Sequence, residues 1–85
     1  MVKIKITNHA RKRAKERGIE LNWIELILKI PDEVIDVKFG RKAAYKQFND
    51  DFVVVIFEEQ KDEITVITTL KVDKGRLRRY GFSRI

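Results

Sequence analysis

The hydrophobic pattern of the chain changes its period near Glu33, and this change decides which elements the chain can form. Before it, the run from Trp23 to Ile30 is apolar at all but two positions; after it, apolar and polar side chains alternate, as from Ile35 to Phe39. A period of about 3.6 residues predicts a helix and a period of two predicts a strand. We therefore expect helices before Glu33 and a sheet after it.

The order of the expected elements is one strand, two helices and then four strands. The first helix begins at a cap, Thr7 or Asn8, and the second begins after a cap at Asn22. This order predicts an α+β fold: a β-α-α unit followed by a four-stranded antiparallel meander, with both helices packed on one face of the sheet. The expected strands are residues 2–6, 35–39, 41–48, 52–57 and 64–70, and the expected helices are residues 8–17 and 23–30.

The length of the chain allows one domain with a small core, because it has 85 residues. Residues 1–85 are assigned to that domain, and residues 71–85 to a basic C-terminal tail. No apolar run approaches the roughly 18 residues of a membrane helix, and the chain starts directly with a strand pattern instead of a signal peptide. The expected location is the cytoplasm, with no membrane partner.

One stretch, residues 8–19, holds the only histidine of the chain and five of its nineteen Lys and Arg residues. A helix through this stretch, ended by Gly18, places His9, Arg13 and Arg17 at successive i, i+4 steps, so that they form one stripe. An imidazole beside a guanidinium at the margin of a core is a candidate site for a phosphate.

The positive charge of the chain lies in two segments. The net charge is +6; residues 11–17 carry +4 and residues 71–85 carry +5, so the remainder is −3. Such a balance favours a polyanion as partner, and the two segments make one positive face if the fold brings them together. A solvated surface and a disordered tail stay open as alternatives. The nucleic-acid-binding candidates are Arg11, Lys12, Lys71, Lys74, Arg76, Arg78 and Arg79.

The sequence lacks the residues that several kinds of catalytic and metal site need. There is no cysteine, and one histidine is too few for a usual protein-built zinc site. Neither a Gly-rich phosphate loop nor a nucleophile elbow is present, which argues against nucleotide hydrolysis and serine-hydrolase chemistry. We expect no metal and no other cofactor.

Four short motifs resemble those of a group of small prokaryotic proteins, a domain of unknown function of the DUF4258 type. They are His-Ala-x-x-Arg-x-x-x-Arg-Gly-Ile at residues 9–19, Pro-Asp-Glu-Val at 31–34, Ile-Thr-Val-Ile-Thr at 64–68 and Arg-Arg-Tyr at 78–80. This group is similar to the RelE-like and BrnT-like toxins of type II toxin–antitoxin systems. The resemblance implies a RelE-like fold, metal-independent endoribonuclease activity, RNA as substrate, in some cases at the ribosome, and an antitoxin protein as partner.

The resemblance also implies roles for individual residues. His9, Arg13 and Arg17 match the opening motif and Tyr80 matches the tail motif. The implied reaction is attack of a ribose 2′-hydroxyl on the adjacent phosphate, which needs a base, an acid and positive charge. His9 would be the base or the acid and Arg13 the phosphate clamp. The chain departs from a full acid–base pair because it has no second histidine, so Tyr80 or Lys71 would be the second proton carrier.

Two other functions stay open, and several candidates have structural alternatives. The first is a non-catalytic RNA- or DNA-binding module that uses the same basic surface. The second is a small structural protein that works by association, because the helix from Trp23 to Ile30 is apolar nearly all round and needs cover from a second copy or an antitoxin. His9 could be a structural hydrogen-bonding group. Trp23 is expected in the core, and Tyr45 is expected to pack on the sheet instead of on bases.

Overall fold

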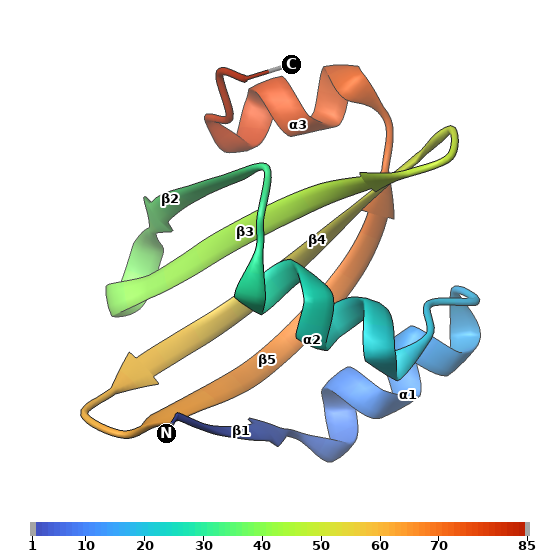
Figure 1. Cartoon of the computed structure of the whole chain (residues 1–85). Helices are drawn as coiled ribbons and strands as arrows, with labels where there is room; N and C mark the ends of the chain where they lie inside the picture. Colours follow the sequence, from blue (N-terminus) through green and yellow to red (C-terminus); the bar gives the residue numbers. More distant parts are fainter. Residues whose placement is uncertain (1, 85) are drawn as a thin grey trace.

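The computed structural model describes residues 2–84 of the chain and shows five strands and three α-helices in that range (Figure 1). In chain order the elements are β1 (Lys3–Ile6), α1 (Asn8–Glu16), α2 (Leu21–Lys29), β2 (Glu33–Val37), a short 3-10 turn (Lys38–Gly40), β3 (Arg41–Phe48), β4 (Asp51–Gln60), β5 (Glu63–Val72) and α3 (Lys74–Tyr80).

The five strands form one sheet in the order β1-β5-β4-β3-β2. The β5-β4, β4-β3 and β3-β2 pairs are antiparallel, whereas β1 runs parallel to the first part of β5, with Ile4 opposite Ile64. Thr7, at the end of β1, fixes this junction because its hydroxyl donates to the carbonyl of Val66 at 2.9 Å. The same Thr7 oxygen accepts from the amide of Ala10 and caps α1.

The predicted fold class is therefore wrong. The sheet is not a four-stranded antiparallel meander, because β1 joins it as a fifth strand in parallel with β5. The helices are not confined to one face either, because the predicted basic tail contains a third helix. Asp73 caps that helix by accepting from the amide of Arg76 at 2.8 Å. The physical reason is that the tail carries two large apolar side chains, Leu77 and Phe82, which are both buried against the sheet.

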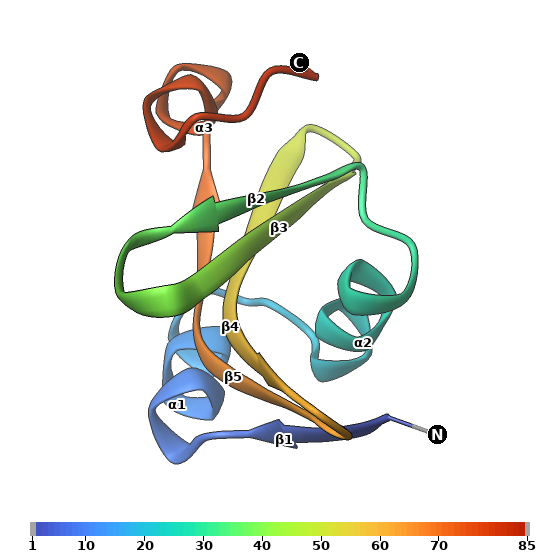
Figure 2. The same cartoon turned by 90° about the vertical axis from the view of Figure 1, so that its left-hand side faces the viewer.

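The two faces of the sheet are covered by different helices, and Figure 2 shows α2 and α3 on opposite sides of the strands. α1 and α2 pack on the face that presents Val53 and Val55, and α3 packs on the face that presents Val54. Successive side chains of a strand point to opposite faces, so a strand that is covered on both faces is apolar at every position. This explains the continuous apolar run in β4 and gives the domain two small cores.

The second helix is covered mainly by its own sheet. Ile24 and Ile27 are fully buried, and the ring of Trp23 stacks on that of Phe48 with their centroids 4.7 Å apart. The expected cap at Asn22 is wrong, since α2 already begins at Leu21 without a side-chain cap. The apolar side chains of α2 and its C-cap that remain exposed are Leu21, Leu26 and Ile30.

The chain end after α3 is held to β2 and β3. The Glu33 carboxylate accepts from the amides of Ser83 and Arg84, at 2.9 and 2.7 Å, and from the Ser83 hydroxyl at 3.1 Å. The buried Tyr45 hydroxyl donates to the Arg84 carbonyl, and the Tyr45 ring meets the Phe82 ring edge-on. Burial raises the pKa of Tyr45, so its hydroxyl stays a donor. The tail is thus ordered through Arg84.

Glu33 is expected to make the stability of this contact depend on pH. The backbone hydrogen bond from Arg84 is the largest of the causes that lower the Glu33 pKa below its ordinary value of 4.5. A lowered pKa stabilises the fold above the ordinary value, and that stabilisation is lost as the pH falls through the lowered one. We expect Glu33→Gln to lower the melting temperature near neutral pH, and the difference from the parent protein to vanish in strong acid.

Thermal unfolding of both proteins between neutral pH and about pH 2 checks this expectation. Glu25→Gln is the matched control, because Glu25 is exposed on α2 and makes no side-chain hydrogen bond within residues 2–84. The expectation is wrong if Glu33→Gln and Glu25→Gln show the same pH dependence.

Candidate nucleic-acid interface

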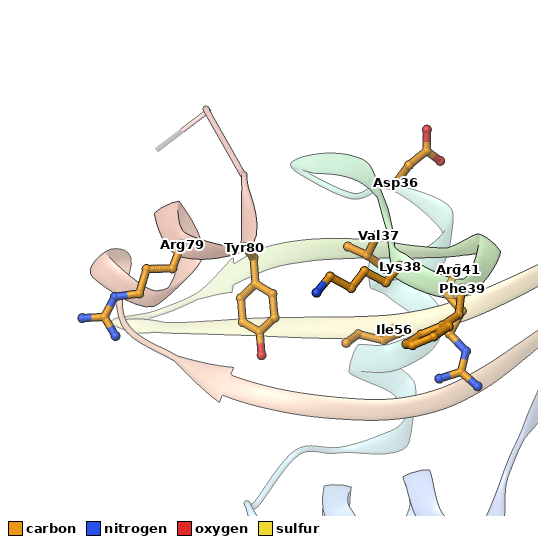
Figure 3. A pocket seen from close by; sticks show the side chains of 8 residues that line it. All are labelled: Asp36, Val37, Lys38, Phe39, Arg41, Ile56, Arg79 and Tyr80. Carbon is orange, nitrogen blue, oxygen red and sulfur yellow. The ribbon is translucent and has the colours of Figure 1, made fainter.

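A cavity of about 410 Å³ lies on the α3 side of the sheet, between the β2–β3 hairpin and α3 (Figure 3). Its volume falls within the range of about 300 to 1,000 Å³ that is usual for ligand sites. The hairpin supplies most of its wall, β4 supplies the floor and α3 supplies the far side. We call this cavity the hairpin pocket; its lining residues are Asp36, Val37, Lys38, Phe39, Arg41, Ile56, Arg79 and Tyr80.

The tip of the hairpin holds an aromatic side chain in solvent. Val37 pairs with Arg41, so only Lys38, Phe39 and Gly40 connect the two strands. Phe39 and Gly40 both have positive φ angles, 64° and 68°. For a bulky residue this left-handed conformation costs about 1 kcal/mol or more. The expectation that Phe39 continues a strand is wrong, because the turn takes its side chain off the sheet and leaves it 87% exposed.

The hairpin pocket has an excess of positive charge. Lys38, Arg41 and Arg79 stand against the single carboxylate of Asp36. Arg41 Nε lies 3.0 Å from a Glu58 oxygen in a partly exposed ion pair, and such pairs are weak enough for a phosphate to compete with them. Within residues 2–84, Lys38 and Arg79 have no carboxylate at ion-pair distance.

The polar groups of the pocket are arranged around Tyr80. In Figure 3 the Lys38 ammonium extends toward the Tyr80 ring, and the Tyr80 hydroxyl points away from α3. The Arg79 and Asp36 side chains extend outward from it. Tyr80 itself is half-buried and packs against the second core, whereas Lys38 and Arg79 are exposed.

The stripe predicted on the first helix forms, but two of its members already have partners. His9 is exposed and makes no side-chain hydrogen bond within the described range. Arg13 pairs with Glu16 across 3.5 Å. Arg17 Nη1 donates to the Thr69 carbonyl at 2.9 Å. β1 pairs with β5 only up to Val66, so the Thr69 carbonyl lies on the unpaired part of the β5 edge. Arg17 has a structural role there, because it donates the hydrogen bond that β1 does not supply.

The structure brings the two basic segments together only at Lys71, whose ammonium lies close to Gly18, just after α1. The other basic residues of the second segment lie on α3 or after it. α1 and α3 lie at opposite ends of the molecule in both Figure 1 and Figure 2, and they pack on opposite faces of the sheet. His9 and Tyr80 therefore share no pocket within one chain. The predicted residues that do meet are Arg79 and Tyr80, which also line a smaller cavity of about 140 Å³ with Arg76.

The remaining sequence candidates lie on the surface. Arg11 and Lys12 are exposed on α1, and Lys74 and Arg78 are exposed on α3. Lys71, at the end of β5, lies 3.7 Å from an Asp51 carboxylate oxygen. None of these five side chains lines the hairpin pocket, so they contribute to its field only from a distance.

Sequence reasoning missed the residues of the hairpin itself, Asp36, Lys38, Phe39 and Arg41, as parts of a site. The signal was present in Lys38-Phe39-Gly40-Arg41, where a glycine breaks the alternation and marks a tight turn. A turn at this point carries the preceding aromatic side chain into solvent between two cations.

The described residues show neither a metal-binding group nor a membrane helix. Within residues 2–84, no three His, Asp or Glu side chains gather in a group that could hold a metal ion. In the same range no helix has the length and apolar character needed to cross a membrane.

The fold and the site define a small α+β domain with a basic pocket edged by an exposed aromatic residue. A family model described as a domain of unknown function, DUF4258, matches residues 6–71, and the chain belongs to this family. The chain itself matches no curated protein and no solved structure. The matched range includes the whole β2–β3 hairpin and ends before α3, so Arg79 and Tyr80 lie outside it.

Proposed function

We propose that the protein binds RNA through the hairpin pocket. The observation that carries this proposal is the meeting of three cations from three segments, Lys38 from the turn, Arg41 from β3 and Arg79 from α3, around one cavity edged by Phe39 and Tyr80. Cations neutralise the phosphate backbone, and aromatic rings stack on unpaired bases. RNA is proposed in preference to DNA because the group of proteins whose motifs this chain shares resembles RNA-cleaving toxins.

Loss of two pocket cations is expected to weaken RNA binding and its dependence on salt. Lys38→Ala combined with Arg79→Ala should raise the dissociation constant roughly ten-fold at low salt. It should also reduce the slope of log affinity against log salt by about 1.4, because two phosphate contacts to a single strand are lost. Fluorescence anisotropy with a labelled single-stranded RNA over a range of salt concentrations measures both quantities.

The matched control is Arg11→Ala combined with Lys12→Ala, which removes the same charge from the exposed surface of α1 at the other end of the molecule. We expect this double variant to bind RNA almost as the parent does. If instead the α1 variant loses RNA binding and the Lys38 and Arg79 variant keeps it, the interface is the predicted α1 stripe and the pocket proposal is wrong.

RNA cleavage is the second proposed function: a metal-independent endoribonuclease, the toxin of a toxin–antitoxin pair. The presence of Tyr80, whose hydroxyl can donate a proton, in the lining of the same pocket as Lys38 and Arg79 favours it. Attack of a 2′-hydroxyl on the adjacent phosphate expels the 5′-oxygen. Tyr80 would protonate that leaving oxygen while the proton of the 2′-hydroxyl passes to water. Lys38 and Arg79 would stabilise the charge on the phosphoryl oxygens.

Association with a second copy or an antitoxin is proposed on a smaller surface than the sequence predicts. Ile24 and Ile27 are buried by the sheet, and Trp23 and Leu28 pack against the same core. What remains for a partner is the exposed apolar residues of α2 and its C-cap together with Val34 on the neighbouring edge strand. A ribosomal site of action likewise rests on the resemblance alone.

A further inference from the structure

The conformation and exposure of Phe39, at the tip of the β2–β3 hairpin, do not contribute to the stability of the domain. Phe39 is a bulky residue with φ 64° and ψ 31°, and its side chain is 87% exposed. It belongs to neither hydrophobic core and stacks on no aromatic ring within residues 2–84. The fold thus accepts an unfavourable backbone conformation and a solvated ring without gaining buried surface. Such an outlier points to a role in recognition.

The surroundings of the ring indicate what it recognises. Phe39 lies in the sequence between Lys38 and Gly40, and it lines the hairpin pocket with Arg41 and Arg79. An apolar protein surface would meet these cations at a cost, because they would lose water without gaining a partner. A nucleotide offers both matching groups, a flat base for the ring and a phosphate for the cations.

We propose that Phe39 stacks on an unpaired base, so that the hairpin pocket selects single-stranded RNA over duplex RNA. This inference rests on the proposed RNA binding and names the class of RNA. In an A-form duplex the bases are stacked inside the helix, so the protein meets mainly phosphates and 2′-hydroxyls. A phenyl ring at the tip of a hairpin then has no exposed base face to stack on, whereas the cations bind either form.

The test compares the binding of a short single-stranded RNA with that of the duplex made from it, using the parent protein and two variants. Phe39→Asn removes the ring but keeps a residue that tolerates the left-handed conformation, and Phe39→Trp keeps a stacking surface. We expect Phe39→Asn to weaken single-strand binding by about ten-fold and to leave duplex binding unchanged. Phe39→Trp should bind the single strand at least as well as the parent.

Thermal unfolding shows whether the variant keeps its fold. Because Asn relieves the strain at this position, Phe39→Asn should melt at the same temperature as the parent or higher. A variant that is equally or more stable and yet binds single-stranded RNA less tightly places the role of Phe39 in recognition.

Three outcomes would overturn the inference in distinguishable ways. Equal affinity of the parent for the single strand and the duplex, with no effect of Phe39→Asn, removes base stacking but leaves the cationic binding proposal intact. Absence of any RNA binding by the parent removes the proposed function as well. If Phe39→Asn changes the oligomeric state in light scattering and not RNA affinity, the ring is a contact between copies of the protein.

Discussion

Tyr80→Phe is expected to slow RNA cleavage by roughly a hundred-fold or more, because it removes the hydroxyl that would protonate the leaving oxygen in the hairpin pocket. The ring stays, so the contact of Tyr80 with the second core is kept. RNA affinity should therefore change by less than about two-fold, since the lost interaction acts only in the transition state. Single-turnover cleavage and binding, measured on one RNA, separate the two effects.

His9→Ala is the decisive comparison, because the sequence alone favours His9 as the proton carrier. His9 is exposed on α1, at the far end of the molecule from Tyr80, and no hydrogen bond within residues 2–84 positions its ring. General acid–base catalysis needs a group within reach of the reacting oxygens, and His9 does not line the hairpin pocket, so we expect His9→Ala to cleave at the parent rate. The opposite result, a slow His9→Ala and an active Tyr80→Phe, would move the chemistry to the α1 stripe.

Arg13 and Arg79 allow a similar comparison, which shows which of the two guanidinium groups stabilises the charge of the reacting phosphate. Its pairing with Glu16 is exposed and weak, so the guanidinium could still be recruited by a phosphate bound at α1. If cleavage occurs in the hairpin pocket, Arg13→Ala should leave both rate and affinity nearly unchanged. Arg79→Ala should lower the affinity for RNA and the rate together, because a cation beside the phosphate acts in the ground state and the transition state.

Local elements could be predicted from the sequence because their signals are local. The alternation in residues 2–6, the alanines of the first helix and the apolar run of β4 each lie within one element. The position of β1 could not be predicted in this way. Its partner in the sheet starts at Glu63, and an alternating pattern fixes which side chains face the core but not which distant strand lies beside it.

The third helix could not be predicted from the sequence because its segment is strongly basic. Residues 71–85 carry six basic residues, and that density favoured reading them as a tail. Two buried side chains, Leu77 and Phe82, outweigh it, because a fully buried Leu or Phe contributes about 1.5 to 3 kcal/mol whereas exposed charges contribute little.

The candidate site was only partly predictable for a related reason. Arg79 and Tyr80 were candidates because they match a motif, but the hairpin residues opposite them match none. Phe39 looked like the last residue of a strand face, and only the observed turn, with Gly40 also at positive φ, shows that its ring is in solvent. A pocket formed by the β2–β3 hairpin, β4 and α3 cannot be recognised before the topology is known.

Leu77 is the residue on which this topology depends most, since it is the fully buried side chain of α3. Leu77→Ala is expected to destabilise the domain by about 2 to 5 kcal/mol, the usual cost of such a truncation. For a chain of this length the total stability is on the order of 4 to 13 kcal/mol. Urea unfolding followed by the fluorescence of Trp23 measures the loss.

The position of the probe makes this experiment informative. Trp23 packs on Phe48 in the first core, on the other face of the sheet from Leu77. If α3 belongs to the same cooperative unit, Leu77→Ala shifts the Trp23 transition to lower urea, whereas Arg78→Ala, an exposed change in the same helix, moves it little. An unchanged transition in Leu77→Ala would show that α3 docks independently, and in that case the variant should still fold but lose RNA binding, because Arg79 and Tyr80 reach the hairpin pocket only from the docked helix.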